Sequence, residues 1–99
     1  MAARNFEVAQ DVDGTYLLKG DLTIHDLDYL KGFLENARSR SRKLNLSLAE
    51  VGFADTASLQ LIIAFRKNLG SGGKLVITAL SPEVEKILEV SGLKSQMTS

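Results

Sequence analysis

Residues 5–10 (NFEVAQ) alternate between apolar and polar side chains, which predicts a half-buried β-strand. The dipeptide Asp-Gly at 13–14 is typical of a hairpin turn, so residues 15–19 (TYLLK) are expected to form the partner strand. Glycine and aspartate at 20–21 are expected to end this second strand. The chain therefore begins with a predicted β-hairpin.

A spacing of three and four residues between apolar side chains predicts the first helix. These side chains are Leu27, Leu30, Leu34 and Ala37, with Phe33 widening the same face. Thr23 and Asp26 resemble a capping box ahead of this helix, with Asp in place of the usual Glu. Basic residues between Arg38 and Lys43 suit the negative end of its dipole.

The middle of the chain predicts a strand followed by a second helix. Leucines alternate in KLNLSLAEV (43–51), and Val51 and Phe53 are expected in the turn segment that follows. Residues 57–69 (ASLQLIIAFRKNL) form the most strongly predicted helix, which the glycine-rich stretch 70–73 is expected to end. Its apolar face comprises Leu59, Ile62, Ile63 and Leu69, widened by Leu61 and Phe65.

A last strand and helix complete the predicted order. Residues 74–80 (KLVITAL) form a continuous run rich in β-branched residues, typical of a strand covered on both faces. Ser81 and Pro82 are expected to start a helix as N-cap and first residue, and Gly92 to end it. Its apolar face comprises Val84, Ile87, Leu88 and Leu93. The predicted fold class is α/β, a small mixed sheet of about four strands with about three helices in the order β-β-α-β-α-β-α.

Composition narrows the functional classes. A chain of 99 residues that is 44% hydrophobic and 24% charged is expected to form one globular domain, residues 1–99. The lack of cysteine excludes disulfides, thiolate catalysis and cysteine zinc sites, and a net charge of zero argues against a dedicated nucleic-acid binder. The longest apolar run, 61–65, is far short of the roughly 20 residues of a membrane helix, and residues 1–6 lack the apolar stretch of a signal peptide. We therefore expect a cytoplasmic protein without membrane insertion.

Three features that suggest chemistry give only weak signals. His25 is the single histidine and has no evident catalytic or metal-binding partner. Residues 70–74 (GSGGK) resemble a phosphate loop, but the spacing fails and the stretch leaves a helix rather than entering one. The basic residues at 38–43 are compatible with an anion or an acidic partner, or with a solvated helix end. We expect neither enzymatic activity nor a cofactor.

Residues 53–59 (FADTASL) form the most informative segment, because a strand ends there and a buried helix begins. One interpretation is simple capping, in which Asp55 or Thr56 accepts a hydrogen bond from a backbone amide. A second interpretation starts from the same amides: they would also hold a phosphate attached to Thr56. That phosphate would add about −1.5 to −2 charge units to a surface of short side chains.

The run VGFADTASLQLIIAF, the glycine pair at 72–73 and the segment SPEVEKILEVSGL together resemble STAS domains, the fold of sulphate transporters and anti-sigma-factor antagonists. The resemblance covers about residues 14–93 and implies that Thr56 occupies the position of the phosphorylatable Ser or Thr. It also implies a regulatory, non-enzymatic module that binds a serine/threonine kinase of the anti-sigma type. A phosphatase would reset the switch, and the pathway would be sigma-factor regulation or chemotaxis signalling.

Three positions differ from the antagonist pattern. Ser58 stands where Gly is usual, Ala57 replaces a second hydroxyl, and Thr23 occupies a loop position where several antagonists carry Asp. The Asp-Thr-Ala form also resembles STAS subunits of lipid-transporting ABC systems, in which the domain binds the ATPase without phosphorylation. The expected partner-binding residues are Asp55, Thr56, Ala57, Ser58, Thr23 and Gln60. The sequence does not determine the oligomeric state.

Overall fold

The computed structural model describes residues 5–98, apart from the side chains of Ser71 and Thr98. The strands are β1 (Phe6–Gln10), β2 (Tyr16–Leu22), β3 (Lys43–Ala54) and β4 (Lys74–Leu80). The helices are α1 (Leu27–Arg40), α2 (Thr56–Lys67), α3 (Pro82–Ser91) and α4 (Lys94–Thr98), with 3-10 turns η1 (Ile24–Asp26) and η2 (Gly70–Gly72). Residues 1–4, which belong to the stretch considered above as a signal peptide, lie outside the described part.

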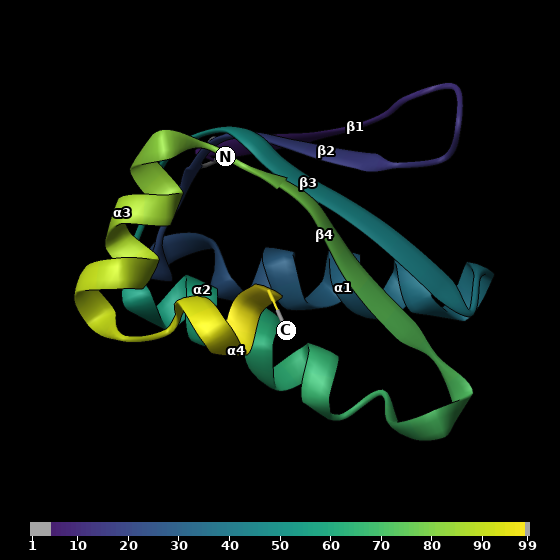
Figure 1. Ribbon diagram of the computed structural model, residues 1–99. Coiled ribbons are helices and arrows are strands. Elements are labelled where there is room, and N and C mark those ends of the chain that lie inside the picture. The colour runs from purple at the N-terminus through teal and green to yellow at the C-terminus, as the bar shows by residue number, and fades with distance from the viewer. Residues whose placement is uncertain (1–4, 99) are drawn as a thin grey trace.

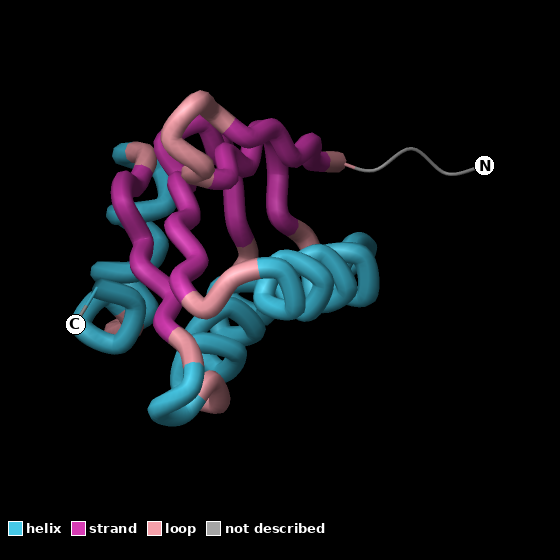
Figure 2. Tube along the Cα trace, turned by 90° about the vertical axis from the view of Figure 1, so that its right-hand side faces the viewer, coloured by secondary structure: helices cyan, strands magenta, loops and turns pink. Residues whose placement is uncertain are grey.

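The four strands form one mixed sheet in the order β1-β2-β3-β4. The hairpin pair β1–β2 is antiparallel, and β2–β3 and β3–β4 are parallel, as expected for strands joined through helices. Figures 1 and 2 show α1 and α2 on the same side of the sheet, with α3 at the end where β3 and β4 finish. The predicted α/β class and element order are confirmed, with the short α4 in addition.

The core lies between the sheet and the helices. The predicted faces of α1 and α2 are buried at Leu30, Leu34, Leu59 and Ile62, and the alternating leucines of β3 are buried opposite them. Phe33 stacks edge-on against Tyr16 of β2, with ring centroids 5.2 Å apart. The spacing of apolar residues in the sequence therefore identified the packed faces correctly.

The middle strands are longer than the sequence predicted. β2 continues through Gly20 to Leu22, and β3 continues through Val51 and Phe53 to Ala54, where a break and a turn were expected. Two register shifts between β2 and β3 allow this continuation. Gly20 adopts φ +109°, and a Cβ atom there would lie 2.5 Å from the Asn5 carbonyl oxygen. The glycine thus permits close approach of β1 instead of ending the strand.

The predicted capping box ahead of α1 is wrong. The turn η1 intervenes, and the side chain of Thr23 makes no capping hydrogen bond. Both residues instead hold Asn5 at the start of the hairpin. The Asn5 backbone N–H donates to Asp26 Oδ2 at 2.9 Å, and the Asn5 amide group donates to Thr23 Oγ1 at 3.4 Å. A contact between distant segments has replaced the local one.

Lys74 and Thr78 of β4 are exposed to solvent, so the expectation that this strand is covered on both faces is wrong. Leu75 is its only fully buried residue.

α2 ends at Lys67, before the glycine-rich stretch, although Gly70 does adopt a positive φ of 65°. α3 begins and ends as predicted, with the N-cap Ser81 and the left-handed Gly92. None of the helices between residues 5 and 98 is long and apolar enough to span a membrane.

Candidate functional site

The start of α2 is fixed by both carboxylate oxygens of Asp55. Oδ1 accepts the Ser58 backbone N–H at 2.9 Å, which is an N-cap bond inside α2. Oδ2 accepts the Ile24 backbone N–H at 2.7 Å, from the turn that precedes α1. The Asp55 backbone N–H donates to the Leu22 carbonyl oxygen at 3.0 Å. The capping interpretation is therefore correct for Asp55, which also joins the ends of two neighbouring parallel strands.

Thr56 is the first residue of α2, and it is exposed. Within residues 5–98, no hydrogen bond occupies its hydroxyl group. The residue before it, Asp55, takes part in four hydrogen bonds, so the Thr56 backbone is fixed while its side chain stays accessible. This combination presents a hydroxyl group to solvent on a rigid support.

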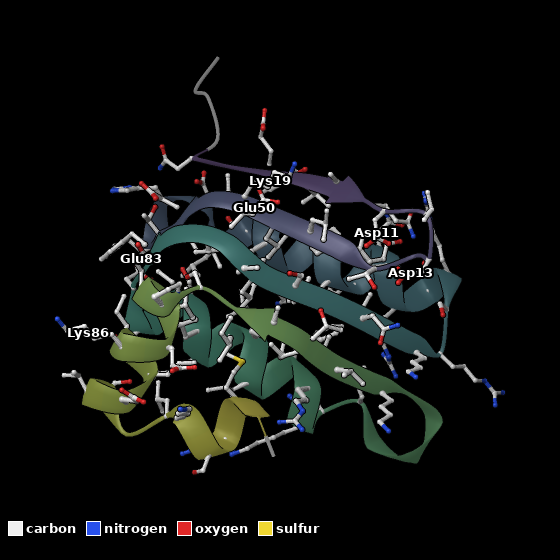
Figure 3. The ribbon with its side chains drawn as sticks, turned by 45° about the horizontal axis from the view of Figure 1, so that its top comes forward. Asp11, Asp13, Lys19, Glu50, Glu83 and Lys86 are labelled. Atoms are coloured by element: carbon white, nitrogen blue, oxygen red, sulfur yellow. The ribbon has the colours of Figure 1, made fainter. Side chains whose placement is uncertain are left out.

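A shallow hollow of about 230 Å³ lies beside Thr56. Its other lining residues come from α3: Lys86, Ile87, Val90 and Ser91. Val90 is 81% exposed although it is apolar, and Ile87 is half-buried. Figure 3 shows Lys86 and Glu83 projecting from α3 at this end of the molecule. Thr56 thus borders an exposed apolar surface with a single lysine among its lining residues.

The remaining expected site residues have different environments. Gln60 is exposed one turn further along α2, and Ala57 is half-buried. Thr23 lies next to Ile24 and is therefore close to Asp55, but its hydroxyl group accepts from Asn5. Ser58 has no solvent exposure, so its side chain is not available to a partner in this conformation. Its hydroxyl oxygen also lacks a hydrogen-bond partner among the described residues.

The contribution of α3 to this surface was not predicted from the sequence. Ile87 was assigned to the apolar face of that helix, and Val90 was not considered. Val90 could have been noticed as an apolar residue off that face, because an exposed apolar side chain often marks an interaction surface. Ile24, which is 57% exposed, adds a further apolar side chain next to Asp55.

Two of the weaker candidates, His25 and the glycine-rich stretch 70–74, gain no support. His25 is exposed on η1, and no group of three or more potential metal ligands occurs in residues 5–98. The glycine-rich stretch follows a helix and leads into β4, as expected for a turn rather than a phosphate loop. The surface next to Thr56 that a partner could contact is mainly apolar and carries few charges.

Comparison with known families identifies the chain. A family model described as "Mlab, STAS domain" matches residues 7–98. The chain belongs to the STAS domain family. The resemblance noted in the sequence, from the Asp55-Thr56 segment to the last helix, is thereby confirmed.

Solved STAS structures share this fold. The anti-sigma factor antagonist SpoIIAA in its unphosphorylated form is 19% identical, with a TM-score of 0.67 over 94% of this chain and 85% of that one. An anti-sigma factor antagonist from Mycobacterium paratuberculosis is 19% identical, with a TM-score of 0.72 over 98% and 87%. The phosphorylated form of SpoIIAA, a Bacillus cell fate determinant, is 18% identical, with a TM-score of 0.62 over 94% and 88%. These likenesses show that the chain has the same fold as these structures.

Proposed function

We propose that this STAS domain binds a regulatory protein through the surface around Thr56, and that phosphorylation of Thr56 switches this binding. The observation that carries the proposal is the exposed Thr56 hydroxyl, placed beside an apolar hollow on a backbone that Asp55 holds in position. A partner protein would fill the hollow with an apolar side chain and remove Ile87 and Val90 from water. The partner expected from the family resemblance is a serine/threonine kinase of the anti-sigma type.

A phosphate on Thr56 would change this surface in two ways. It would lie at the positive end of the α2 dipole, which favours the modified form of the domain itself. It would also place about −1.5 to −2 charges at the border of the apolar hollow, where a docked partner would have to remove water from the phosphate. Lys86 lines the hollow and carries a single positive charge, so it could compensate only part of the phosphate charge. Phosphorylation is therefore expected to release the partner.

A second candidate function is permanent attachment to a larger assembly through the same surface, without phosphorylation. The Asp-Thr-Ala sequence, which resembles STAS subunits of lipid-transporting ABC systems, favours this candidate. In this case the Thr56 hydroxyl would contact the partner directly. Its loss would weaken binding, whereas no phosphate would be found on the protein.

Substitutions at Thr56 distinguish the two candidates. The domain is incubated with ATP and an extract of its own cells, and the phosphate is located by mass spectrometry, with Thr56→Ala as the negative control. Binding of the partner protein is then compared for Thr56→Val, which keeps the shape but not the hydroxyl, and Thr56→Glu. Thr78→Glu on β4 is the matched control, because Thr78 is also an exposed threonine but lies on another element.

The switch predicts phosphate on Thr56, near-normal binding by Thr56→Val and loss of binding by Thr56→Glu. Permanent attachment predicts no phosphate and weaker binding by Thr56→Val. Unchanged binding in both Thr56 variants would exclude this surface as the docking site.

A further inference from the structure

The tip of the β1–β2 hairpin presents an apolar side chain between two acids. The Asp11 side chain accepts the backbone N–H groups of Asp13 at 3.0 Å and Thr15 at 3.2 Å, and the Asp13 side chain accepts the Thr15 N–H at 2.9 Å. Val12, between the two acids, makes no shielding contact, with a relative exposure of 107%. Val12 is therefore fully exposed to water, and packing within this chain contributes nothing to its burial.

A cluster of cations lies at the same end of the molecule, which we name the basic cluster. Its members are Arg38, Arg40, Arg42, Lys43 and Lys74, and all are exposed. The Lys74 backbone N–H donates to the Arg42 carbonyl oxygen at 2.8 Å, and Lys43 stands directly opposite Lys74 in the β3–β4 ladder. Like charges facing each other across a ladder are destabilising. No salt bridge to residues 5–98 relieves this repulsion, because the ion pairs found there involve only Lys19 and Lys94.

The basic cluster borders a hollow of about 290 Å³. Its lining comprises Glu35, Arg38, Ser39, Arg42, Gly72 and Gly73. Two arginines and one glutamate therefore line the hollow, and the two glycines contribute no side chains to it. Arginine is well suited to bind carboxylates because its planar group donates two parallel hydrogen bonds.

The hairpin tip and the basic cluster share one end of the molecule. Figure 1 shows the β1–β2 turn, the C-terminus of α1 and the loop before β4 together at the end away from α3. In Figure 3, Asp11 and Asp13 lie at this end, whereas Glu83 and Lys86 lie at the opposite one. The hairpin and the glycine-rich loop belong to opposite margins of the sheet, because β1 and β4 are its two edge strands.

We propose that this end binds a second copy of the same chain across a two-fold axis. The Val12 tip of each protomer would enter the hollow of the other, with Asp11 and Asp13 facing Arg38 and Arg42. A two-fold interface must be self-complementary, so one patch has to carry both halves of each contact. This end of the molecule carries both halves. Asp11, Val12 and Asp13 lie at the hairpin tip, and Arg38 and Arg42 line the hollow. A half-turn brings the hairpin margin of one protomer against the hollow of its partner.

A second copy fits this end better than an acidic protein or an anionic membrane. Either of those partners would meet Asp11 and Asp13 as well as the basic cluster, and the acids would repel it. The side-chain hydrogen bond with Asp11, followed by hydrogen bonds with Thr15, lowers the pKa of Asp13 below its usual 3.8, so this acid stays charged near neutral pH. Two hairpin tips form a small and largely charged interface, so the dimer is expected to be weak and sensitive to salt.

Sedimentation velocity on the purified domain tests this dimer. Concentrations from about 10 µM to about 1 mM cover the affinity expected of so small an interface. The sedimenting mass should approach that of a dimer at the upper end and return to a monomer in high salt. Val12→Lys and Arg42→Glu should each weaken association at least about tenfold, because each brings like charges together in both contacts. Glu83→Lys, at the opposite end and outside the lining of the Thr56 hollow, is the control and should leave association unchanged.

Mixing the two single variants gives the decisive result. In a heterodimer of Val12→Lys with Arg42→Glu, one contact pairs the new lysine with the new glutamate, and the other contact is unaltered. Association should therefore return in the mixture although each variant alone is monomeric. A wild-type chain that remains monomeric throughout, or a dimer that both variants leave intact, would overturn the proposal. Because Thr56 lies at the other end, either result leaves the proposed Thr56 switch untouched.

Discussion

The carboxylate of Asp55 binds the backbone N–H of Ile24 at 2.7 Å, so the start of α2 is tied to the turn that precedes α1. These two segments follow the ends of the neighbouring parallel strands β3 and β2, where Leu22 and Ala54 face each other in the ladder. The other carboxylate oxygen caps α2 through Ser58. One side chain thus determines where the exposed Thr56 hydroxyl stands relative to the rest of the site.

Removing this carboxylate should destabilise the fold. Asp55→Ala breaks both hydrogen bonds, and loss of a helix cap alone costs about 0.5–2 kcal/mol of unfolding free energy. Asp55→Asn keeps one acceptor oxygen and should lose less stability than Asp55→Ala. Urea unfolding followed by circular dichroism measures both. Equal stability of Asp55→Ala and the wild type would show that neither bond contributes.

Two buried serines should respond to substitution with opposite signs. Ser58→Ala removes a hydroxyl group that is buried without a hydrogen-bond partner among the described residues, so stability should stay unchanged or rise. Ser81→Ala removes a hydroxyl that donates to the Val51 carbonyl oxygen at 2.6 Å and accepts the Val84 N–H at 3.1 Å. Its loss should cost about 1–3 kcal/mol, since a buried carbonyl group and a helix N-terminus lose their partner. A larger loss for Ser58→Ala than for Ser81→Ala would contradict this assignment.

The inner face of α2 anchors the helix that carries Thr56. Ile62 has no solvent exposure, so Ile62→Ala should cost about 2–5 kcal/mol through lost burial and the cavity left behind. Val90→Ala is the matched control, because Val90 is also a β-branched residue on a helix but is 81% exposed. Its effect on unfolding should stay within about 0.5 kcal/mol. Thermal or urea unfolding of both variants provides the comparison.

The hairpin turn should contribute to stability in a pH-dependent way. The hydrogen bond with the Asp11 side chain, followed by those with Thr15, lowers the pKa of Asp13 below 3.8 in the folded state. The unfolded chain therefore binds more protons, and the contribution is present above 3.8 and lost as the pH falls through the folded-state pKa. Asp13→Asn should make the fall of stability in acid shallower than in the wild type. Urea unfolding from neutral to acidic pH measures the two slopes, and identical slopes would exclude the contribution.

Local signals in the sequence were sufficient for most elements. The N-cap Ser81 and the left-handed Gly92 of α3 depend on hydrogen bonds and backbone angles within a few residues, and both were predicted correctly. The inner faces of α1 and α2 follow from the helical period alone. Asp55-Thr56 was recognised as a helix start for the same reason, because the cap bond to Ser58 spans only three residues.

The errors at Thr23, Asp26 and Gly20 involve contacts between segments distant in the sequence. Thr23 and Asp26 were expected to cap α1 but bind Asn5, which the hairpin brings within reach. Gly20 was expected to end β2, yet it lets β1 approach closely. The residues of α3 that border Thr56 lie thirty or more positions further along the chain, so no local pattern could connect them.

The sequence by itself determined the elements, their buried faces and the position of Thr56 at the start of a helix, because propensity, capping and periodicity act over a few residues. Only the tertiary structure decided that Val90 and Lys86 border Thr56, and that the β1–β2 turn shares one end of the molecule with the C-terminus of α1. The physical reason is that these neighbours are set by strand pairing and helix packing, which depend on the whole fold at once.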